Sequence, residues 1–443
     1  MYAFYKCKLT KLTFLSSKTE IANNSFNGCK IEDLKCYISQ ILQLKEEIAS
    51  SLKKLVLSFD DDKIKCIKFN SFIYLQNVTF ISSTTKIDDF SLVGCYQLTN
   101  VSIHFPITSI GDNVFLGCSS LTQIILPSSL TKIGDFAFSE CSSLYDFLIP
   151  SSVISIGEYA FNGCTSLRQM IIPSSVISIG SNAFNGCTSL KQMIIPSSVI
   201  SIGSNAFNGC SSLVQIEIPS SITKINSSTF SGCSSLKQIV IPSSVTSIDY
   251  NAFSECSSLL KISIPISITS ISNNSFYLCK LLREISIPSS VTRIDSYAFA
   301  KCASIEHLII PSSVTSIGDF AFSQCSALTE IKLPFSVTSI GDYVFSGCSS
   351  LTHIFIPSLL ASVGDYIFSG CSSLTHISFN ISGSSFKHFS FSNSTSLEEK
   401  PKSFYSPGNN SLRKSNCRKI MDEFIFQHMS NNSKSEKFNL NKL

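Results

Sequence analysis

Cysteine and histidine are the residues of this chain whose types and spacing could support chemistry. The chain has 443 residues, among them 18 cysteines and six histidines. Thirteen cysteines recur at intervals of 23 residues, from Cys95 to Cys371. Cysteines in such numbers could form disulfides or bind a metal ion. Their identical place in each repeat favours a column of reduced thiols that pack as small hydrophobes, because an odd number of equivalent cysteines cannot all pair.

A second candidate is one position of consecutive repeats that holds acidic and imidazole side chains. The residues at this position are Glu284, His307, Glu330, His353 and His376. On parallel strands they would stand about 4.8 Å apart, and they could bind a divalent metal or change charge between about pH 5 and 7. Side chains that stand parallel on a strand surface do not converge tetrahedrally. We therefore expect a solvated polar ladder, with no metal and no cofactor.

Motifs that would indicate an enzyme are missing from the chain. The sequence has no glycine-rich phosphate-binding loop, no zinc-protease motif and no serine-hydrolase elbow. A nucleophile needs a nearby base and an orienting group, and the abundant serines lie in expected turns. We expect a protein without catalytic residues.

The elements that carry these residues follow from the repeat itself, which is clearest over residues 310–334. One unit reads C-x-x-L-x-x-I-x-I-P-S-S-V-T-S-I-G-D-x-A-F-x-x. L-x-x-I-x-I predicts a short strand that the proline ends, and V-T-S-I predicts a second extended piece. We expect a positive φ at the glycine of Gly-Asp. We also expect Asp319, Ser181 and Asn273 to cap one helical turn that ends in Ala-Phe.

A constant period with a constant apolar pattern predicts a solenoid, because a lone unit cannot bury its apolar face without its neighbours. The segments L-x-x-I-x-I-P and S-I-G-D-x-A-F-x-x-C resemble the BspA-type leucine-rich repeats, a class of 23 residues, over about residues 49–393. The resemblance implies an α/β, β-rich repeat solenoid, a right-handed superhelix with parallel strands on its concave face. It also implies a surface-antigen or adhesin-like scaffold that binds other proteins.

The sequence predicts three regions. Residues 1–48 hold an N-terminal repeat and a segment, 30–48, whose apolar spacing is close to that of a helix. A degenerate repeat is the alternative for this segment. Residues 49–399 form the solenoid, in a chain of about sixteen coils. Residues 400–443 form a basic tail, expected to be disordered or a short helix.

Two columns of side chains should point outward from the first strand of each coil. Glutamines occupy the position before the first Ile of I-x-I, and their amides could hydrogen-bond along the stack or contact a ligand. The position between the two Ile residues forms the second column, which is apolar. A contiguous exposed apolar surface usually marks an interaction site, although β-branched residues also suit strand packing. The predicted protein-binding residues of the concave face are Ile125, Leu148, Ile171, Ile194, Gln169, Gln192, Gln215, Gln238, His307, Glu330, His353 and His376.

Composition narrows the classes of partner. The net charge of +4 without a basic stripe argues against nucleic acid. The sequence contains no run of about 20 apolar residues, so we predict no transmembrane segment. We expect a monomer with a protein ligand.

The sequence allows more than one cellular compartment, and it allows repeats with or without a fixed ligand. The N-terminus lacks the features of a signal peptide, which favours a cytoplasmic interaction adaptor, whereas the resemblance implies the cell surface. The near-identity of residues 154–186 and 177–209 favours a third interpretation, an expanded array without a fixed ligand.

Overall fold

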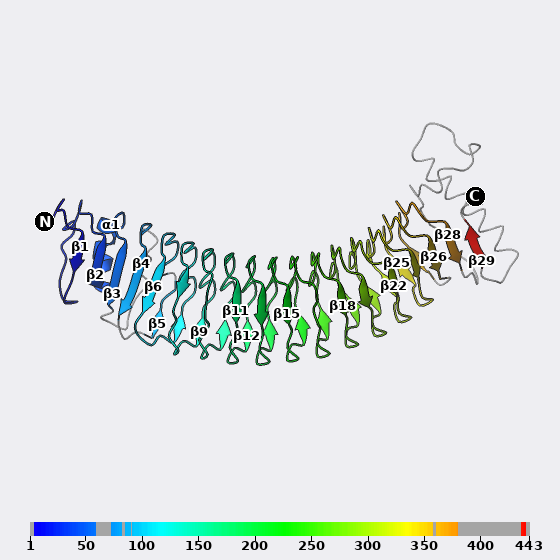
Figure 1. Ribbon diagram of the computed structural model, residues 1–443, viewed down its shortest axis with the longest axis horizontal. Helices are drawn as coiled ribbons and strands as arrows, with labels where there is room; N and C mark the ends of the chain where they lie inside the picture. The colour runs from blue at the N-terminus through cyan, green and yellow to red at the C-terminus, as the bar shows by residue number, and fades with distance from the viewer. Residues whose placement is uncertain are drawn as a thin grey trace, which may run out of the picture. The chain divides into compact units, whose positions relative to one another are not determined.

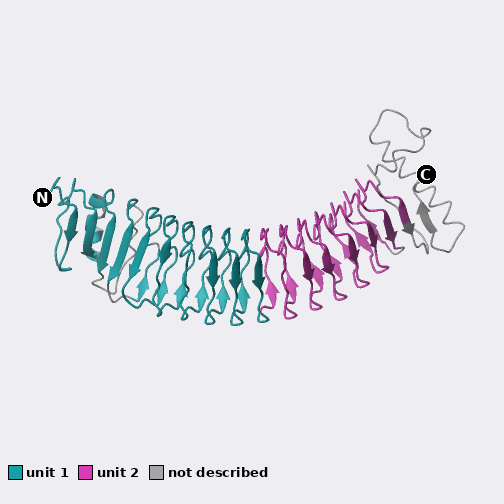
Figure 2. Cartoon of the chain, viewed as in Figure 1, with its two compact units in different colours: residues 1–221 teal, residues 222–443 magenta. Residues whose placement is uncertain are grey.

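The computed structural model describes residues 4–58, 72–81, 85–89, 91–357, 360–379 and 436–439. The chain is a parallel β-solenoid of about 15 turns of about 23 residues, with little helix (Figure 1). This confirms the predicted fold class. The chain divides into two compact units, Met1–Ser221 and Ile222–Leu443 (Figure 2). We call them unit 1 and unit 2.

Most regular coils contribute two short strands. The first strand comes from L-x-x-I-x-I and the second from S-I of V-T-S-I. First strands pair in parallel with first strands one coil away, as Gln169 pairs with Gln192, and second strands do the same, as Ser155 pairs with Ser178. The two ladders satisfy backbone donors and acceptors that a lone coil would leave without partners.

Unit 1 contains nine first strands and six second strands among its described residues. The first strands are β1 (Lys11–Thr13), β2 (Asp33–Tyr37), β3 (Lys54–Ser58), β4 (Asn77–Ile81), β6 (Asn100–Ile103), β8 (Gln123–Ile124), β11 (Gln169–Ile171), β13 (Gln192–Ile194) and β15 (Gln215–Glu217). The second strands are β5 (Lys86–Ile87), β7 (Ser109–Ile110), β9 (Lys132–Ile133), β10 (Ser155–Ile156), β12 (Ser178–Ile179) and β14 (Ser201–Ile202).

Unit 2 repeats the same arrangement. Its first strands are β18 (Lys261–Ser263), β20 (Glu284–Ser286), β22 (His307–Ile309), β24 (Glu330–Lys332), β26 (His353–Ile356) and β28 (His376–Phe379). Its second strands are β16 (Lys224–Ile225), β17 (Ser247–Ile248), β19 (Ser270–Ile271), β21 (Arg293–Ile294), β23 (Ser316–Ile317), β25 (Ser339–Ile340) and β27 (Ser362–Val363). Strand β29 (Glu436–Asn439) pairs antiparallel with β28. The short helix considered for the rest of the tail lies outside the described residues.

The segment 30–48 combines the two alternatives that the sequence left open. Strand β2 pairs in parallel with β1 on one side and with β3 on the other, so this segment supplies a coil in register. Helix α1 (Ile38–Ile48) then takes the place of the second strand. Its buried Ile41, Leu44 and Ile48 recur at helical spacing, so the helix packs one apolar face onto the solenoid.

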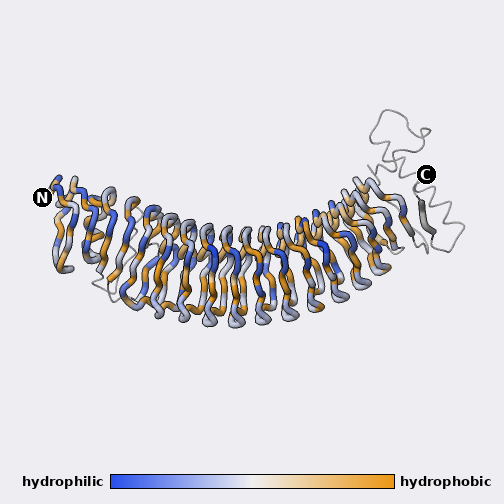
Figure 3. Tube along the Cα trace, viewed as in Figure 1, coloured by the Kyte–Doolittle hydropathy of each residue, from blue (hydrophilic) through white to orange (hydrophobic). Residues whose placement is uncertain are grey.

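The core repeats from coil to coil. Phe184 of unit 1 has no exposed surface, and its ring stacks between Phe161 and Phe207 at centroid distances of 5.4 and 5.6 Å. Phe322 of unit 2 lies between its two neighbours at 5.6 Å on each side. Figure 3 shows the apolar stretches recurring along successive coils. Each buried ring contributes about 2–3 kcal/mol of hydrophobic stabilisation.

The prediction of a positive φ at the glycine of Gly-Asp is wrong. In the coils that have it, this glycine allows a close approach: a Cβ on Gly180 would lie 2.6 Å from the carbonyl carbon and oxygen of Gly157 in the preceding coil. The left-handed conformation falls instead two residues later, at Asn182 (φ 57°), and before the cysteine, at Gly186 (φ 71°). Asn and Gly adopt that conformation more readily than other residues.

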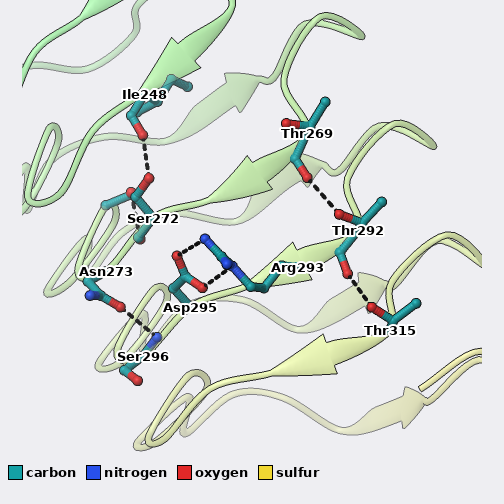
Figure 4. Close-up of polar contacts among 10 residues, drawn as sticks. Ile248, Thr269, Ser272, Asn273, Thr292, Arg293, Asp295, Ser296 and Thr315 are labelled. Atoms are coloured by element: carbon teal, nitrogen blue, oxygen red, sulfur yellow. Dashed lines mark hydrogen bonds and ion pairs between the residues drawn. The ribbon is translucent and has the colours of Figure 1, made fainter. Parts of the chain in front are cut away.

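The predicted helical turn before Ala-Phe is also wrong. The left-handed residue breaks the helical path, and the segment forms turns. The side chains predicted as helix caps join neighbouring coils instead: Asp319 Oδ1 accepts a hydrogen bond from Asp342 N–H (2.8 Å), and Asn273 Oδ1 accepts one from Ser296 N–H (3.0 Å; Figure 4). Ser181 uses its backbone carbonyl, which accepts from Tyr159 N–H (2.8 Å).

Threonine hydroxyls of V-T-S-I add a side-chain ladder beside the second strands. Thr292 Oγ1 donates to the carbonyl of Thr269 (3.3 Å), and Thr315 Oγ1 donates to the carbonyl of Thr292 (3.1 Å; Figure 4). Each of these threonine hydroxyls therefore links its coil to the backbone of the preceding coil.

Candidate functional site

The apolar column of unit 1 is exposed to solvent. The exposed fractions of Ile125, Leu148, Ile171 and Ile194 are 82%, 74%, 66% and 64%. Ile171 and Ile194 lie side by side, in register on the parallel strands β11 and β13. Their neighbours along the strand, such as Met170 and the glutamines, alternate between buried and exposed, as expected for a strand with one buried face. The four side chains thus form a row that no described residue covers; we call it the first apolar row.

The first-strand ladder is interrupted in the middle of this row. No strand is assigned around Leu148, and the sheet that ends at β8 resumes at β11. The inward position next to Leu148 holds Phe147, whose ring packs edge-on against Phe138 and Phe161 at 4.9 and 4.7 Å. Most other coils have Ile or Met there. The ladder is interrupted again at Val240, where the inward residue is Ile239, so the larger side chain is not required for an interruption.

The glutamine column lies directly beside the apolar row. Gln169, Gln192 and Gln215 are exposed and stand in register on three consecutive strands. An amide ladder of the expected kind forms earlier in the same column, where Asn100 Nδ2 donates to Asn77 Oδ1 (3.0 Å). This face of unit 1 is therefore a strip composed mainly of aliphatic and amide groups, with exposed Asp146 in the glutamine column and exposed Glu217 in the apolar column.

The sequence analysis missed a second apolar row in the same coils. Ile154, Ile177 and Ile200 are 46%, 45% and 63% exposed, at the place where most other coils have the threonine of V-T-S-I. The backbone ladder persists here, since Ile177 N–H donates to Ile154 O and Ile200 N–H to Ile177 O, both at 2.9 Å. The replacement of V-T-S-I by V-I-S-I was the signal that could have revealed this row.

The predicted site residues of unit 2 form a charged and polar column. Gln238 forms an isolated parallel bridge with Lys261, which pairs with Glu284 at 2.8 Å. The hydrogen bond and charge of Lys261 lower the pKa of Glu284. His307, Glu330, His353 and His376 then follow in register on consecutive strands.

The histidines of this column stack on each other. The rings of His353 and His376 lie 4.5 Å apart with an interplanar angle of 9°. Each Nδ1 lies within hydrogen-bond distance of a neighbouring threonine hydroxyl, at 2.8 Å to Thr352 and 2.9 Å to Thr375. Within the described ranges, no three His, Cys, Asp or Glu side chains are grouped so that they could hold a metal ion.

The cysteine column is structural. None of the sixteen described cysteines is in a disulfide, and among them only Cys7 is exposed. In most coils the thiol donates to the carbonyl of the phenylalanine one coil back, as Cys210 does to Phe184 and Cys325 to Phe299, both at 3.2 Å. Burial raises the pKa of Cys210 and Cys325 to about 12. Such thiols are poor nucleophiles at neutral pH.

In the described part of the chain, no helix has the length and apolar character needed to cross a bilayer.

Comparison with known proteins gives one family match. The sequence model described as "BspA type Leucine rich repeat region (6 copies)" matches residues 1–60, 48–168, 154–283 and 269–398. No curated protein matches the chain.

Several solved structures are similar. A leucine-rich repeat protein from Bacteroides ovatus is 33% identical over 61% of this chain and 82% of its own, with a TM-score of 0.45. A leucine rich cell surface protein from Faecalibacterium prausnitzii is 26% identical over 75% and 84%, with a TM-score of 0.45. A leucine-rich repeat protein from Eubacterium ventriosum is 23% identical over 65% and 83%, with a TM-score of 0.46.

Proposed function

The chain belongs to the family of BspA-type leucine-rich repeat proteins, and from this premise we propose that it is a non-catalytic scaffold that binds a protein partner. The binding surface is the first apolar row of unit 1, with the glutamine column beside it. The observation that supports this surface is that four aliphatic side chains, at one position of consecutive coils, are 64–82% exposed.

The size of the row fits the centre of an interface. Full burial of an aliphatic side chain contributes about 1.5–3 kcal/mol, and a few such residues supply most of the energy of many interfaces. Gln169, Gln192 and Gln215 would form the polar rim, because each amide offers both donors and an acceptor.

The partner should present an apolar and largely uncharged surface. Between residues 123 and 217 the two columns hold four aliphatic side chains, four glutamines and two acidic residues, Asp146 and Glu217. Attraction between exposed charges is screened by salt, whereas burial of apolar surface is not. Binding through this strip should therefore change little between low and moderate ionic strength.

The proposal includes the adhesin-like role at the cell surface that the family resemblance implies. A cytoplasmic adaptor would use the same strip. Biotinylation of intact cells separates the two: labelling of this protein, with a cytosolic marker unlabelled, supports the surface role, and an unlabelled protein supports the adaptor.

The test of the binding surface is the double variant Ile171→Glu, Ile194→Glu in the full chain. Both side chains are exposed, so we expect the fold to persist while capture of the partner on immobilised protein is lost. The matched control is Val240→Glu, Ile309→Glu in unit 2, where the side chains are 79% and 85% exposed. Proteins retained by each variant would be quantified by mass spectrometry. Equal retention by both variants would discard the apolar row as the binding site.

A further inference from the structure

A second candidate site lies in the N-terminal coils of unit 1, away from the two apolar rows. A cleft of about 1000 Å³ is formed by the loop of residues 23–30, helix α1, residues 50–53 and Tyr74. Its volume is at the upper end of the roughly 300–1,000 Å³ of small-molecule sites. It occurs where α1 replaces the second strand of a regular coil.

Helix side chains hold the wall of the cleft in place. The two carboxylate oxygens of Glu47 accept hydrogen bonds from the backbone N–H groups of Asn24 (2.8 Å) and Phe26 (2.7 Å). Gln43 Oε1 accepts from Ile21 N–H (3.3 Å). Asn24 adopts the left-handed conformation (φ 62°) that this turn requires. The wall is thus formed before any ligand binds, which lowers the entropic cost of binding.

The charges of the lining largely cancel. Lys53 Nζ pairs with Glu32 at 3.1 Å, and the remaining charges of the lining are those of Lys30 and Glu47, whose carboxylate accepts two backbone hydrogen bonds. Lys30 is the lining cation for which the described residues provide no ion pair. A phosphate or polyanion would need several converging cations or N–H groups. An aliphatic ligand would need an apolar wall, which the Asn and Ser residues of this cleft do not offer.

The remaining groups suit a ligand rich in hydroxyls. Exposed Asn23, Asn27 and Ser50 each present donors and acceptors, as neighbouring sugar hydroxyls do. Tyr74 is 42% exposed at the edge of the cleft and offers an aromatic surface with a polar end. The C–H face of a pyranose ring can pack on such a surface while its hydroxyls meet the amides. We propose that this cleft binds a neutral oligosaccharide, independently of the protein-binding rows.

The test uses the full chain and three neutral probes: cellotriose, mannotriose and N,N′,N″-triacetylchitotriose. Saturation-transfer NMR should show transfer to at least one of them, and a titration should give a Kd in the millimolar range. Tyr74→Ala should weaken that binding at least tenfold, whereas Tyr74→Phe, which keeps the ring, should retain it within about threefold. Tyr96→Ala is the matched control, because Tyr96 is an exposed tyrosine (59%) outside the cleft lining.

Each outcome of this test either supports or overturns the proposed oligosaccharide site. Binding that is lost in Tyr74→Ala and kept in Tyr96→Ala supports the proposal, provided that both variants have the circular dichroism spectrum of the wild type. No transfer to any of the three probes, or equal binding by all variants, overturns it. Loss of protein capture in Ile171→Glu, Ile194→Glu has no bearing on this result, so the two proposals fail separately.

Discussion

Units 1 and 2 have the same interior and different outward faces. Phe184 and Phe322 are both fully buried in stacks of phenylalanine rings, and Cys210 and Cys325 both donate to a phenylalanine carbonyl at 3.2 Å. On the first-strand face, unit 1 presents Ile171 and its equivalents. Unit 2 places Val240, Ser263, Ser286, Ile309, Lys332 and Phe355 at the matching position, so its exposed aliphatic residues there do not follow one another in consecutive coils.

The residue in the left-handed conformation at the corner of each coil also varies, in both units. In unit 2, four half-exposed or exposed aromatic residues in the left-handed conformation stack in sequence at 4.6, 4.7 and 4.9 Å: Tyr297, Phe320, Tyr343 and Tyr366. Unit 1 has a shorter stack, Phe136 on Tyr159 at 4.5 Å, and asparagine follows at Asn182 and Asn205, as it does at Asn251 and Asn274 of unit 2. Inward positions must fill a fixed space between coils, whereas outward positions are free to vary. Differences between the faces are therefore where recognition should be sought.

The largest expected effect is the loss of stability at alkaline pH, which would show whether the buried thiols of the two units behave alike. Burial raises the pKa of Cys210 and Cys325 to about 12, against about 8.5 in an unfolded chain. Their stabilising contribution is complete below about pH 8.5 and falls as the pH rises toward 12. Each such thiol then removes about 1.4 kcal/mol of the free energy of unfolding per pH unit.

Several thiols of this kind should unfold the protein between about pH 9 and 11. Circular dichroism and thiolate absorbance would be followed together through an alkaline titration. Cys210→Ala and Cys325→Ala should each move the midpoint upward, by similar amounts. A midpoint that moves in only one variant would show that the two columns differ.

The next effect tests whether the cores are equivalent. Phe184→Ala in unit 1 and Phe322→Ala in unit 2 each remove a fully buried ring. Each should lower the free energy of unfolding by about 3–5 kcal/mol, and the two losses should agree within about 1 kcal/mol. Because the chain has no tryptophan, urea unfolding would be followed by circular dichroism. A loss below about 1 kcal/mol in either variant would contradict a shared core.

The smallest effect tests the freedom of the outward face. Ile171→Lys gives unit 1 the residue type of unit 2, and Lys332→Ile makes the reverse change. Both positions are exposed, so each substitution should shift the free energy of unfolding by no more than about 0.5 kcal/mol. Urea midpoints of the two variants and the wild type would show this. A loss above about 1 kcal/mol would mean that the column supports the fold.

Much of the fold was accessible from residue types alone. The 23-residue period, the alternation of I-x-I and the proline after it predicted the parallel solenoid, and the exposure of Ile171 follows from the same alternation. The roles of Gly180 and Asp319 were assigned wrongly, because both depend on the neighbouring coil. The spacing between coils is a tertiary distance, and a pattern within one coil does not contain it.

The cleft beside α1 was missed for a related reason. Its lining joins Asn23 and Asn27 of one loop with Ser50 and Tyr74, three separate segments that share no motif. Only the packing of α1 against the turn through Glu47 brings them to one place.

The sequence by itself determined which residues face inward and that the coils stack, since hydrophobic periodicity is a property of the chain read residue by residue. The tertiary structure decided how closely the coils approach, where the backbone turns left-handed and which surface groups meet. These depend on contacts between residues about 23 positions apart, whose distances are set only when the neighbouring coil is in place.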